Sequence, residues 1–554
     1  MEPRDPWSAI TTARRLVASP ALAQLAVPGQ PASARHPKLL LSAPPVFVLP
    51  PPDVRRLMEE DEARQQWPFR YGAVIATALS SDEVGEWSAL PGGELVWRLA
   101  LSSPGALSLG VLFDRFELPA GGELYLYDPA RANVLGAFSN AVRQENGMLA
   151  VQPLLGDELV LEYVQPAGVL ARPVLRVGEV VHDYRGILDR LALETPVGVD
   201  RAGCLVDINC PAGAEYQDIK RAVMFVLMGG GFCSASLLNN TAEDGTPYFL
   251  TANHCGDMTN VVAVFGYENA GCGPGGASQS QSISGATLLA ASTRFDSQLY
   301  RLSSTPPAAF EPFFAGWERS TTPIGPGISI SHPSGFPKKL ARDDDAPMVS
   351  GTDFRAIWEM GRLEGGSSGS PLFSGAKRVL GPACCVSDFY CNSQWGIYGQ
   401  FGGFWNQQDL EQWLDPLALD PQFFDGHDPF QGEATPFNGS GANPVLYASL
   451  TPPTLGTTWV AQIDTSAVPG AGTTWILGHA SADSGLFLPQ GELLVDLASP
   501  RYFLSIAASS AGLATHSNPL PNIPALAGLT VHTQALIFAP GPVLLTNGVT
   551  LLLR

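Results

Sequence analysis

The chain has few charged residues, and few of those are basic. Only 15% of its 554 residues are charged, and 52 acidic residues outweigh 32 basic ones, which gives a formal net charge of −20. Binding to nucleic acid or to an anionic membrane surface needs an excess of basic side chains. The composition therefore argues against both partners and suits a protein that is soluble outside the cell.

Long apolar runs are also missing. No stretch reaches the about 18 uninterrupted apolar residues that a membrane helix needs, so we expect no membrane insertion. The apolar stretch 16–27 is interrupted by Pro20 and Gln24, which makes it a poor signal peptide. We nevertheless expect a secreted or periplasmic protein, with an atypical leader or with a translation start that lies upstream.

Cysteine is absent before residue 204 and after residue 391. All eight cysteines therefore belong to one oxidised domain, although many pairings are open from the sequence alone. No Cys-x-x-Cys or His-x-x-x-His spacing occurs, so clustered cysteines with His332 do not indicate a zinc site. We expect neither a metal nor another cofactor.

What the chain does contain is a glycine-lined turn around Ser368, with the sequence LEGGSSGSP over residues 363–371. A serine nucleophile needs a base to take its proton and fixed N–H groups to bind the oxyanion, and glycines allow the required backbone angles. We expect the amides of Gly366 and Ser368 to form this oxyanion hole. The alternative is a flexible Gly/Ser linker, but apolar segments at 356–358 and 371–373 favour a tight turn between buried strands.

The matching base is His254, which precedes Cys255 in the segment FLTANHCG, residues 249–256. A carboxylate must orient the imidazole, and Asp296 is the best candidate because it opens an alternating strand pattern. Asp257 is too near His254 in sequence, and residues 343–345 look like a solvated acidic run. The order His, Asp, Ser is that of chymotrypsin.

Several separated segments carry a specific resemblance. They are Cys204 and Cys210 around Asp207, residues 236–241, 248–256, 314–317, 332–333, 366–371, 377–381 and 413–416. In these segments residues 203–427 resemble the lysyl endopeptidase branch of the trypsin-like proteases, the Achromobacter protease type. The resemblance implies a double β-barrel in which His254, Asp296 and Ser368 are base, orienting acid and nucleophile. It also implies the disulfides Cys204–Cys391, Cys210–Cys272 and Cys233–Cys255.

The expected specificity pocket departs from this family. The alignment places Gly396 where the lysine-specific enzymes have an aspartate, and a buried lysine without a counter-charge is costly. Cys384, Cys385 and Val386 replace a histidine and glycines and would narrow the pocket. We therefore predict small or apolar residues before the cleaved bond, with Asp388 as a residue that could enter from the other wall.

Cys384 and Cys385 have no partner implied by the family. They could form a vicinal disulfide, remain thiols in the pocket, or act as small buried apolar residues.

The flanking regions predict an all-β protein of several domains. We expect a leader and proline-rich segment over 1–66, partly disordered, and a cysteine-free β domain over 67–197. The protease domain follows over 198–430, then a linker over 431–440 and a β-sandwich over 441–554. Alternating patterns such as residues 95–99 and 158–163 indicate the strands of the first β domain.

The first β domain resembles the prosegment of the same proteases, especially around residues 116–122, which predicts a zymogen. A carbohydrate-binding sandwich is the alternative, because fold alone does not decide. Ser367 precedes the nucleophile where many trypsin-like enzymes have an aspartate that pairs with a new N-terminus. We therefore expect activation by removal of the prosegment. The linker 193–201 offers an exposed target with Arg201 as its only basic residue, but the sequence leaves the cut site open, because the loss of basic specificity at Gly396 would make self-cleavage there inefficient.

Together these features predict a secreted serine endopeptidase that acts on proteins or peptides. One alternative is a binding protein on a catalytically silent protease scaffold, and another is an esterase. The C-terminal sandwich is expected to be structural. Its alternative role is a surface or polysaccharide contact through Trp459 and Trp475, although both lie in strand patterns typical of a core.

Overall fold

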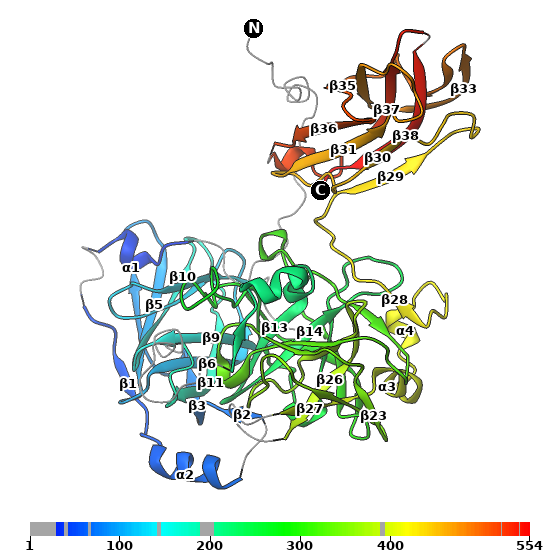
Figure 1. Ribbon diagram of the computed structural model, residues 1–554. Coiled ribbons are helices and arrows are strands. Elements are labelled where there is room, and N and C mark those ends of the chain that lie inside the picture. Colours follow the sequence, from blue (N-terminus) through cyan, green and yellow to red (C-terminus); the bar gives the residue numbers. More distant parts are fainter. Residues whose placement is uncertain are drawn as a thin grey trace. The chain divides into compact units, whose positions relative to one another are not determined.

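The computed structural model describes residues 29–37, 42–64, 68–140, 146–188, 204–387, 394–521, 523–541 and 543–554. Helices are short and strands dominate, so the predicted all-β class is confirmed (Figure 1). The chain divides into two compact units, with the boundary between His427 and Asp428. None of the described helices is long and apolar enough to span a membrane.

The first β region consists of two sheets whose inner faces pack together. One has β1 (Val46–Val48), β4 (Glu86–Ala89), β5 (Leu95–Ser102), β7 (Glu123–Tyr127), β8 (Val134–Phe138) and β10 (Glu158–Gln165). The other has β3 (Gly72–Ser80), β6 (Ser108–Glu117), β9 (Leu149–Leu155) and β11 (Val174–Asp183). Side chains from both sheets, among them Trp97, Phe113 and Tyr163, form one buried core. Two helices, α1 (Ala32–Arg35) and α2 (Val54–Arg64), precede most of these strands.

The expected boundary at residue 67 needs correction. β1 lies inside the proline-rich segment and pairs in parallel with β5, and Leu49 is buried in the core of the β region. Prolines flank this strand but none falls within Val46–Val48, so its ladder is not interrupted. The folded region therefore starts well before residue 67, while residues 1–28 of the expected leader lie outside the described residues.

Two larger sheets form the two halves of the middle region. The first has β2 (Phe69–Arg70), β13 (Val223–Met228), β14 (Gly231–Leu238), β15 (Tyr248–Thr251), β16 (Val262–Val264), β17 (Ser282–Ser284), β18 (Ala286–Ser292) and β19 (Ser297–Leu302). The second has β12 (Val206–Asp207), β20 (Gly316–Glu318), β21 (Gly327–Ser331), β22 (Lys339–Asp343), β23 (Met348–Ser350), β24 (Asp353–Ile357), β25 (Pro371–Phe373), β26 (Arg378–Val386), β27 (Trp395–Gly399) and β28 (Phe423–Phe424). Helices α3 (Phe401–Gln408) and α4 (Glu411–Leu414) follow β27. Side chains such as Leu250, Leu299 and Trp317 join the two halves in one buried cluster.

The C-terminal unit is a β-sandwich. One sheet has β29 (Glu433–Phe437), β32 (Thr473–His479), β35 (Arg501–Ala508), β37 (Thr530–Phe538) and β38 (Leu544–Leu552). The other has β30 (Tyr447–Ser449), β31 (Thr458–Asp464) and β36 (Leu513–Pro519), and β33 (Ala482–Leu488) pairs with β34 (Gly491–Val495). The expected linker 431–440 is wrong, because β29 within it pairs with β38 and extends the sheet.

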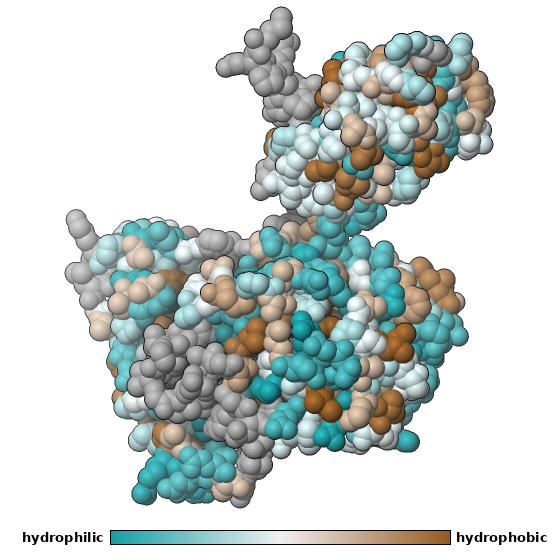
Figure 2. Space-filling model, viewed as in Figure 1, coloured by the Kyte–Doolittle hydropathy of each residue, from teal (hydrophilic) through white to brown (hydrophobic). Residues whose placement is uncertain are grey.

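The two tryptophans of this unit differ in burial. Trp459 is fully buried in the core, and its Nε1 donates to Ser449 Oγ at 2.8 Å. Trp475 is half-buried and packs on Phe538 with 4.8 Å between ring centroids. Trp459 is therefore a core residue and no contact surface. Exposed large apolar side chains are scattered in small groups on the face shown in Figure 2, as is normal for protein surfaces.

Candidate active site

Strand register brings His254 and Asp296 together. β15 and β19 are antiparallel neighbours, and Thr251 is opposite Gln298. His254 follows the end of β15 in the short 3₁₀ turn Asn253–Cys255, and Asp296 precedes the start of β19. The two residues thus leave adjacent strands at the same edge of the sheet, although 42 positions separate them in sequence.

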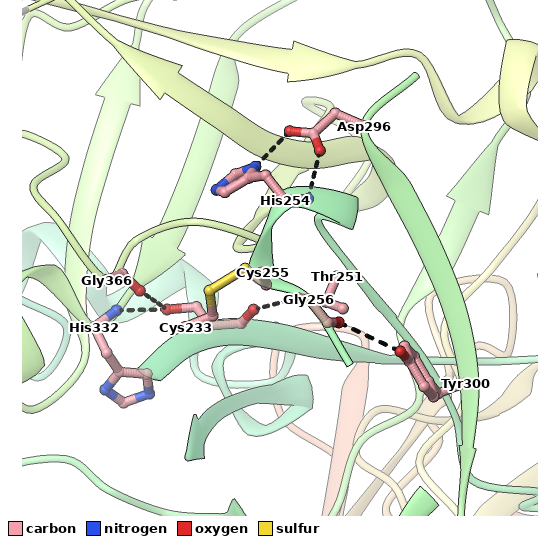
Figure 3. Close-up of a disulfide and its surroundings, with 10 residues drawn as sticks. Cys233, Thr251, His254, Cys255, Gly256, Asp296, Tyr300, His332 and Gly366 are labelled. Carbon is pink, nitrogen blue, oxygen red and sulfur yellow. Dashed lines mark hydrogen bonds and ion pairs between the residues drawn. A yellow bond between two sulfur atoms is a disulfide. The ribbon is translucent and has the colours of Figure 1, made fainter. Parts of the chain in front are cut away.

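The carboxylate of Asp296 contacts His254 twice. Its Oδ2 lies 2.6 Å from Nδ1 of the ring, and its Oδ1 accepts the backbone N–H of His254 at 2.8 Å (Figure 3). When Nδ1–H donates to a carboxylate, Nε2 is the basic nitrogen. Both side chains are about one-fifth exposed, 22% for His254 and 18% for Asp296. The pair is therefore largely shielded from water, and Nε2 of the ring is buried.

A hydrogen bond ties the Ser368 loop to the half of the domain that carries His254. The N–H of Ser234 donates to Ser368 O at 2.8 Å, and Ser234 lies on β14 beside Cys233. Cys233 forms a disulfide with Cys255, the residue after His254 (Figure 3). Ser368 Oγ is buried and accepts no hydrogen bond from the described part of the chain. Strand β14 therefore contacts both candidate residues: Ser234 binds the backbone of Ser368, and Cys233 is bonded to the turn that carries His254.

The turn before Ser368 contains Gly366, whose amide is expected to contribute to the oxyanion hole. Gly366 has a φ of +92°, and its carbonyl accepts Ser234 Oγ at 3.0 Å. The carbonyl of Gly365 accepts the N–H of Ser334 at 2.6 Å. Within the described residues, the N–H groups of Gly366 and Ser368 donate to no backbone carbonyl. Both amides are therefore available to a developing negative charge.

Side-chain hydrogen bonds order this loop. Ser367 Oγ lies 3.0 Å from Ser331 Oγ and accepts the N–H of Glu364 at 3.2 Å. Ser334 Oγ donates to the buried carboxylate of Glu364 at 2.6 Å. These contacts hold the loop, in which Ser367 rather than an aspartate precedes Ser368.

The expected pocket residues lie on two paired strands. Val386 on β26 is opposite Gly396 on β27. A Cβ at Gly396 would lie 3.0 Å from Leu363 Cδ1 and 3.1 Å from Trp358 Cζ2, and both neighbours are buried. The wall at Gly396 is therefore apolar and crowded. Asp388 lies outside the described residues.

The structure contains two of the three disulfides implied by the family, Cys210–Cys272 and Cys233–Cys255. The third cannot be followed, because Cys391 lies outside the described residues. Cys384 and Cys385 form a vicinal disulfide. The sulfur of Cys384 lies within 4.8 Å of ligand atoms of His254 and Asp296, but a disulfide sulfur is not the thiolate that metals bind.

Sequence reasoning missed the residues that support the site. Ser234, Ser331 and Ser334 come from other strands and loops, and no local pattern marks them. Glu364 lies within the turn 363–371, where the sequence does not distinguish it as a supporting residue. Asp353 also lies near the pair: burial, together with the negative charge of Asp296, raises the pKa of its carboxyl.

The chain is similar to known proteins over part of its length. Residues 199–391 match the family model described as lysyl endopeptidase, C-terminal domain. Three similar solved structures are all described as proteases. A Glu endopeptidase is 14% identical, with 37% of this chain and 96% of that chain covered and a TM-score of 0.28. The Rv3671c protease from M. tuberculosis is 15% identical, with 36% and 83% covered and a TM-score of 0.25. The MamO protease domain from Magnetospirillum magneticum is 12% identical, with 35% and 98% covered and a TM-score of 0.24. The family match confirms the resemblance seen in the sequence: residues 199–391 are similar to the C-terminal domain of lysyl endopeptidases.

Proposed function

We propose that the protein is a secreted serine endopeptidase with His254, Asp296 and Ser368 as its catalytic residues. The observation that carries this proposal is the double contact of Asp296 with the ring and the backbone of His254, at 2.6 and 2.8 Å. That geometry fixes both the orientation and the tautomer that a general base needs.

The proposed steps are those of a Ser-His-Asp triad. Ser368 Oγ attacks the peptide carbonyl while its proton passes to Nε2 of His254. The amides of Gly366 and Ser368 bind the oxyanion, and the imidazolium, stabilised by Asp296, then gives its proton to the leaving amine. Water hydrolyses the acyl-enzyme by the same route in reverse.

The pocket supports specificity for small or apolar residues before the cleaved bond. No carboxylate stands at Gly396, and its neighbours Leu363 and Trp358 are apolar. A lysine side chain would lose its hydration there without gaining a counter-charge.

The test is digestion of a denatured protein mixture by the processed enzyme, followed by mass spectrometry of the peptides. A Ser368→Ala variant is the control. Cleavage that is absent from the control supports the proposal, and the residues before the cut sites report the specificity. Cleavage mainly after lysine would overturn the pocket argument. No cleavage by processed wild-type protein, with no labelling of Ser368 by a fluorophosphonate, would favour the catalytically silent scaffold.

A further inference from the structure

A short strand from the N-terminal region joins the protease sheet. β2 pairs antiparallel with β14, with Phe69 opposite Phe232 and Arg70 opposite Gly231. The contact continues beyond the strand, since the N–H of Tyr71 donates to Gly230 O at 2.8 Å. Residues 69–71 thus lie along the start of β14.

The same end of β14 adjoins the candidate active site. Cys233 and Ser234, the next two residues of the strand, bind Cys255 and the Ser368 loop. Phe69 itself contacts that loop, because a Cβ at Gly365 would lie 2.5 Å from its Cδ2. Its ring also packs on Phe232 with 5.0 Å between centroids.

The chemistry of peptide cleavage identifies which half of a substrate belongs here. His254 must give its proton to the leaving amine, so the residues after the cleaved bond lie on the side of His254 and Cys255. Because Cys255 is bonded to Cys233, that side includes the start of β14. An extended peptide can bind a strand edge through main-chain hydrogen bonds, with pockets for alternate side chains.

We propose that Phe69 and Arg70 occupy the place of the substrate residues that follow the cleaved bond, and that the N-terminal β region thereby keeps the protease latent. The surface formed by Phe232 and Gly365 is then a subsite for a large apolar side chain. This inference rests on the proposed function, because it assumes that Ser368 is the nucleophile.

Ionic contacts hold the strand in place. Arg70 forms an ion pair with Asp61 on α2 at 2.7 Å, and Asp61 also binds Arg185 at 2.8 Å. The guanidinium of Arg185 lies 5.2 Å from the centroid of the Phe69 ring. Side chains of the N-terminal region therefore contact both residues of β2: Asp61 binds Arg70, and Arg185 lies against the ring of Phe69.

An apolar core spans the contact as well. It contains Tyr71, Val181 and Ile187 from the N-terminal region and Phe225 and Phe232 from the protease region. This core does not depend on the chain that connects the N-terminal β region to the protease region. Cleavage of that connection alone therefore leaves the N-terminal β region bound.

The experiment uses the full chain with the recognition sequence of a site-specific protease inserted between residues 194 and 201. Phe69→Asp places a charge against Phe232. The matched control is Phe47→Asp, the same change at a residue of β1 that is 36% exposed. Thermal unfolding checks that each variant is folded. Hydrolysis of a quenched fluorescent peptide library and labelling by a fluorophosphonate are measured before and after nicking.

We expect nicked Phe69→Asp to hydrolyse the peptides roughly tenfold faster than nicked wild type or the Phe47→Asp control, a difference of about 1.4 kcal/mol. Arg70→Ala should increase hydrolysis in the same direction, because it removes the ion pair with Asp61 while leaving Phe69 intact. Equal hydrolysis by all nicked proteins, with Ser368 labelled in each, would overturn the latency proposal and leave the protease function standing. Failure of the probe to label Ser368 in any folded variant would overturn both.

Discussion

The backbone of Gly369 packs against the side chain of Thr251 next to the candidate active site. A Cβ at position 369 would be 2.2 Å from Oγ1 of Thr251, whose hydroxyl donates to Ser234 O at 3.0 Å. Thr251 ends the strand before His254, and Gly369 follows Ser368. The glycine therefore lets the loop of the nucleophile approach the strand of the base.

Gly369→Ala should destabilise the protein and abolish most activity. Its φ of +79° disfavours a side chain, and the contact with Thr251 adds overlap that the packed site cannot relieve. Gly351→Ala is the matched control, because φ is +64° but no atom lies within 4 Å of the added Cβ. We expect a loss of about 1 kcal/mol in the control and about 3 kcal/mol or more at Gly369, measured by urea unfolding. Equal losses would contradict the close-approach argument.

Asp296→Asn should lower kcat by about 10⁴-fold with little change in stability. An amide in place of the carboxylate can stabilise the wrong tautomer of His254 and cannot stabilise the imidazolium. Steady-state hydrolysis of a peptide substrate measures the effect. The matched control is Asp257→Asn, which changes another acidic residue three positions after His254. It should keep kcat within about threefold of wild type. A small effect at Asp296 would refute its role.

Removal of the two disulfides should separate stability from activity. Cys233→Ala with Cys255→Ala should cost about 3 kcal/mol and also lower kcat, because the clamp adjoins His254. The Cys210–Cys272 bond closes a loop of 62 residues, whereas the Cys233–Cys255 bond closes one of 22. The double variant Cys210→Ala with Cys272→Ala should therefore lower the free energy of unfolding by at least as much, but it should reduce kcat less. Thermal unfolding and kcat are compared below the transition of each variant. A greater loss of kcat in the second pair would contradict the assigned role of the clamp.

His332 should make the protein sensitive to acid. Burial, with a contribution from the nearby positive charge of Lys338, lowers the pKa of its imidazole to about 3, well below the ordinary value near 6.5. Between these two pH values only the unfolded chain takes up the proton, so the free energy of unfolding falls as the pH drops from 6.5 towards 3.

Replacing His332 by asparagine tests this, since the side-chain amide can keep the contact that Nδ1 makes with Phe336 O at 3.0 Å. The loss of stability between pH 7 and pH 5, measured by urea unfolding, should be about 2 kcal/mol smaller in the variant. The measurement at pH 7 reports the packing cost of the substitution by itself. The same pH dependence in both proteins would show that His332 does not titrate on unfolding.

Much of the candidate site could be predicted from local sequence, because its chemistry needs particular residues in particular turns. The glycines around Ser368 and the His254–Cys255 step are such signals, and the strand pattern that begins at Asp296 indicated the carboxylate, in agreement with the family resemblance. The all-β class followed from alternating patterns and frequent turn residues.

Other features depended on which strands pair. β2 has only two residues, too few for any periodic pattern, and the residues of β14 that it pairs with, Gly231 and Phe232, lie 161 and 163 positions after Arg70 and Phe69. β29 falls in a polar segment that looks like a linker, yet pairing with β38 satisfies its backbone. Both pairings depend on an apolar core and a free strand edge that exist only once the rest of the chain has folded.

The sequence by itself thus determined the class of chemistry, the domain that carries it and its oxidised cysteines, since these depend on residue types at short spacing. Only the tertiary structure decided the vicinal bond between Cys384 and Cys385 beside His254 and Asp296, the serine network around the Ser368 loop, and the contact of Phe69 with Gly365. The physical reason is that such contacts join residues remote in sequence, and their energy depends on distance in space, which no local pattern encodes.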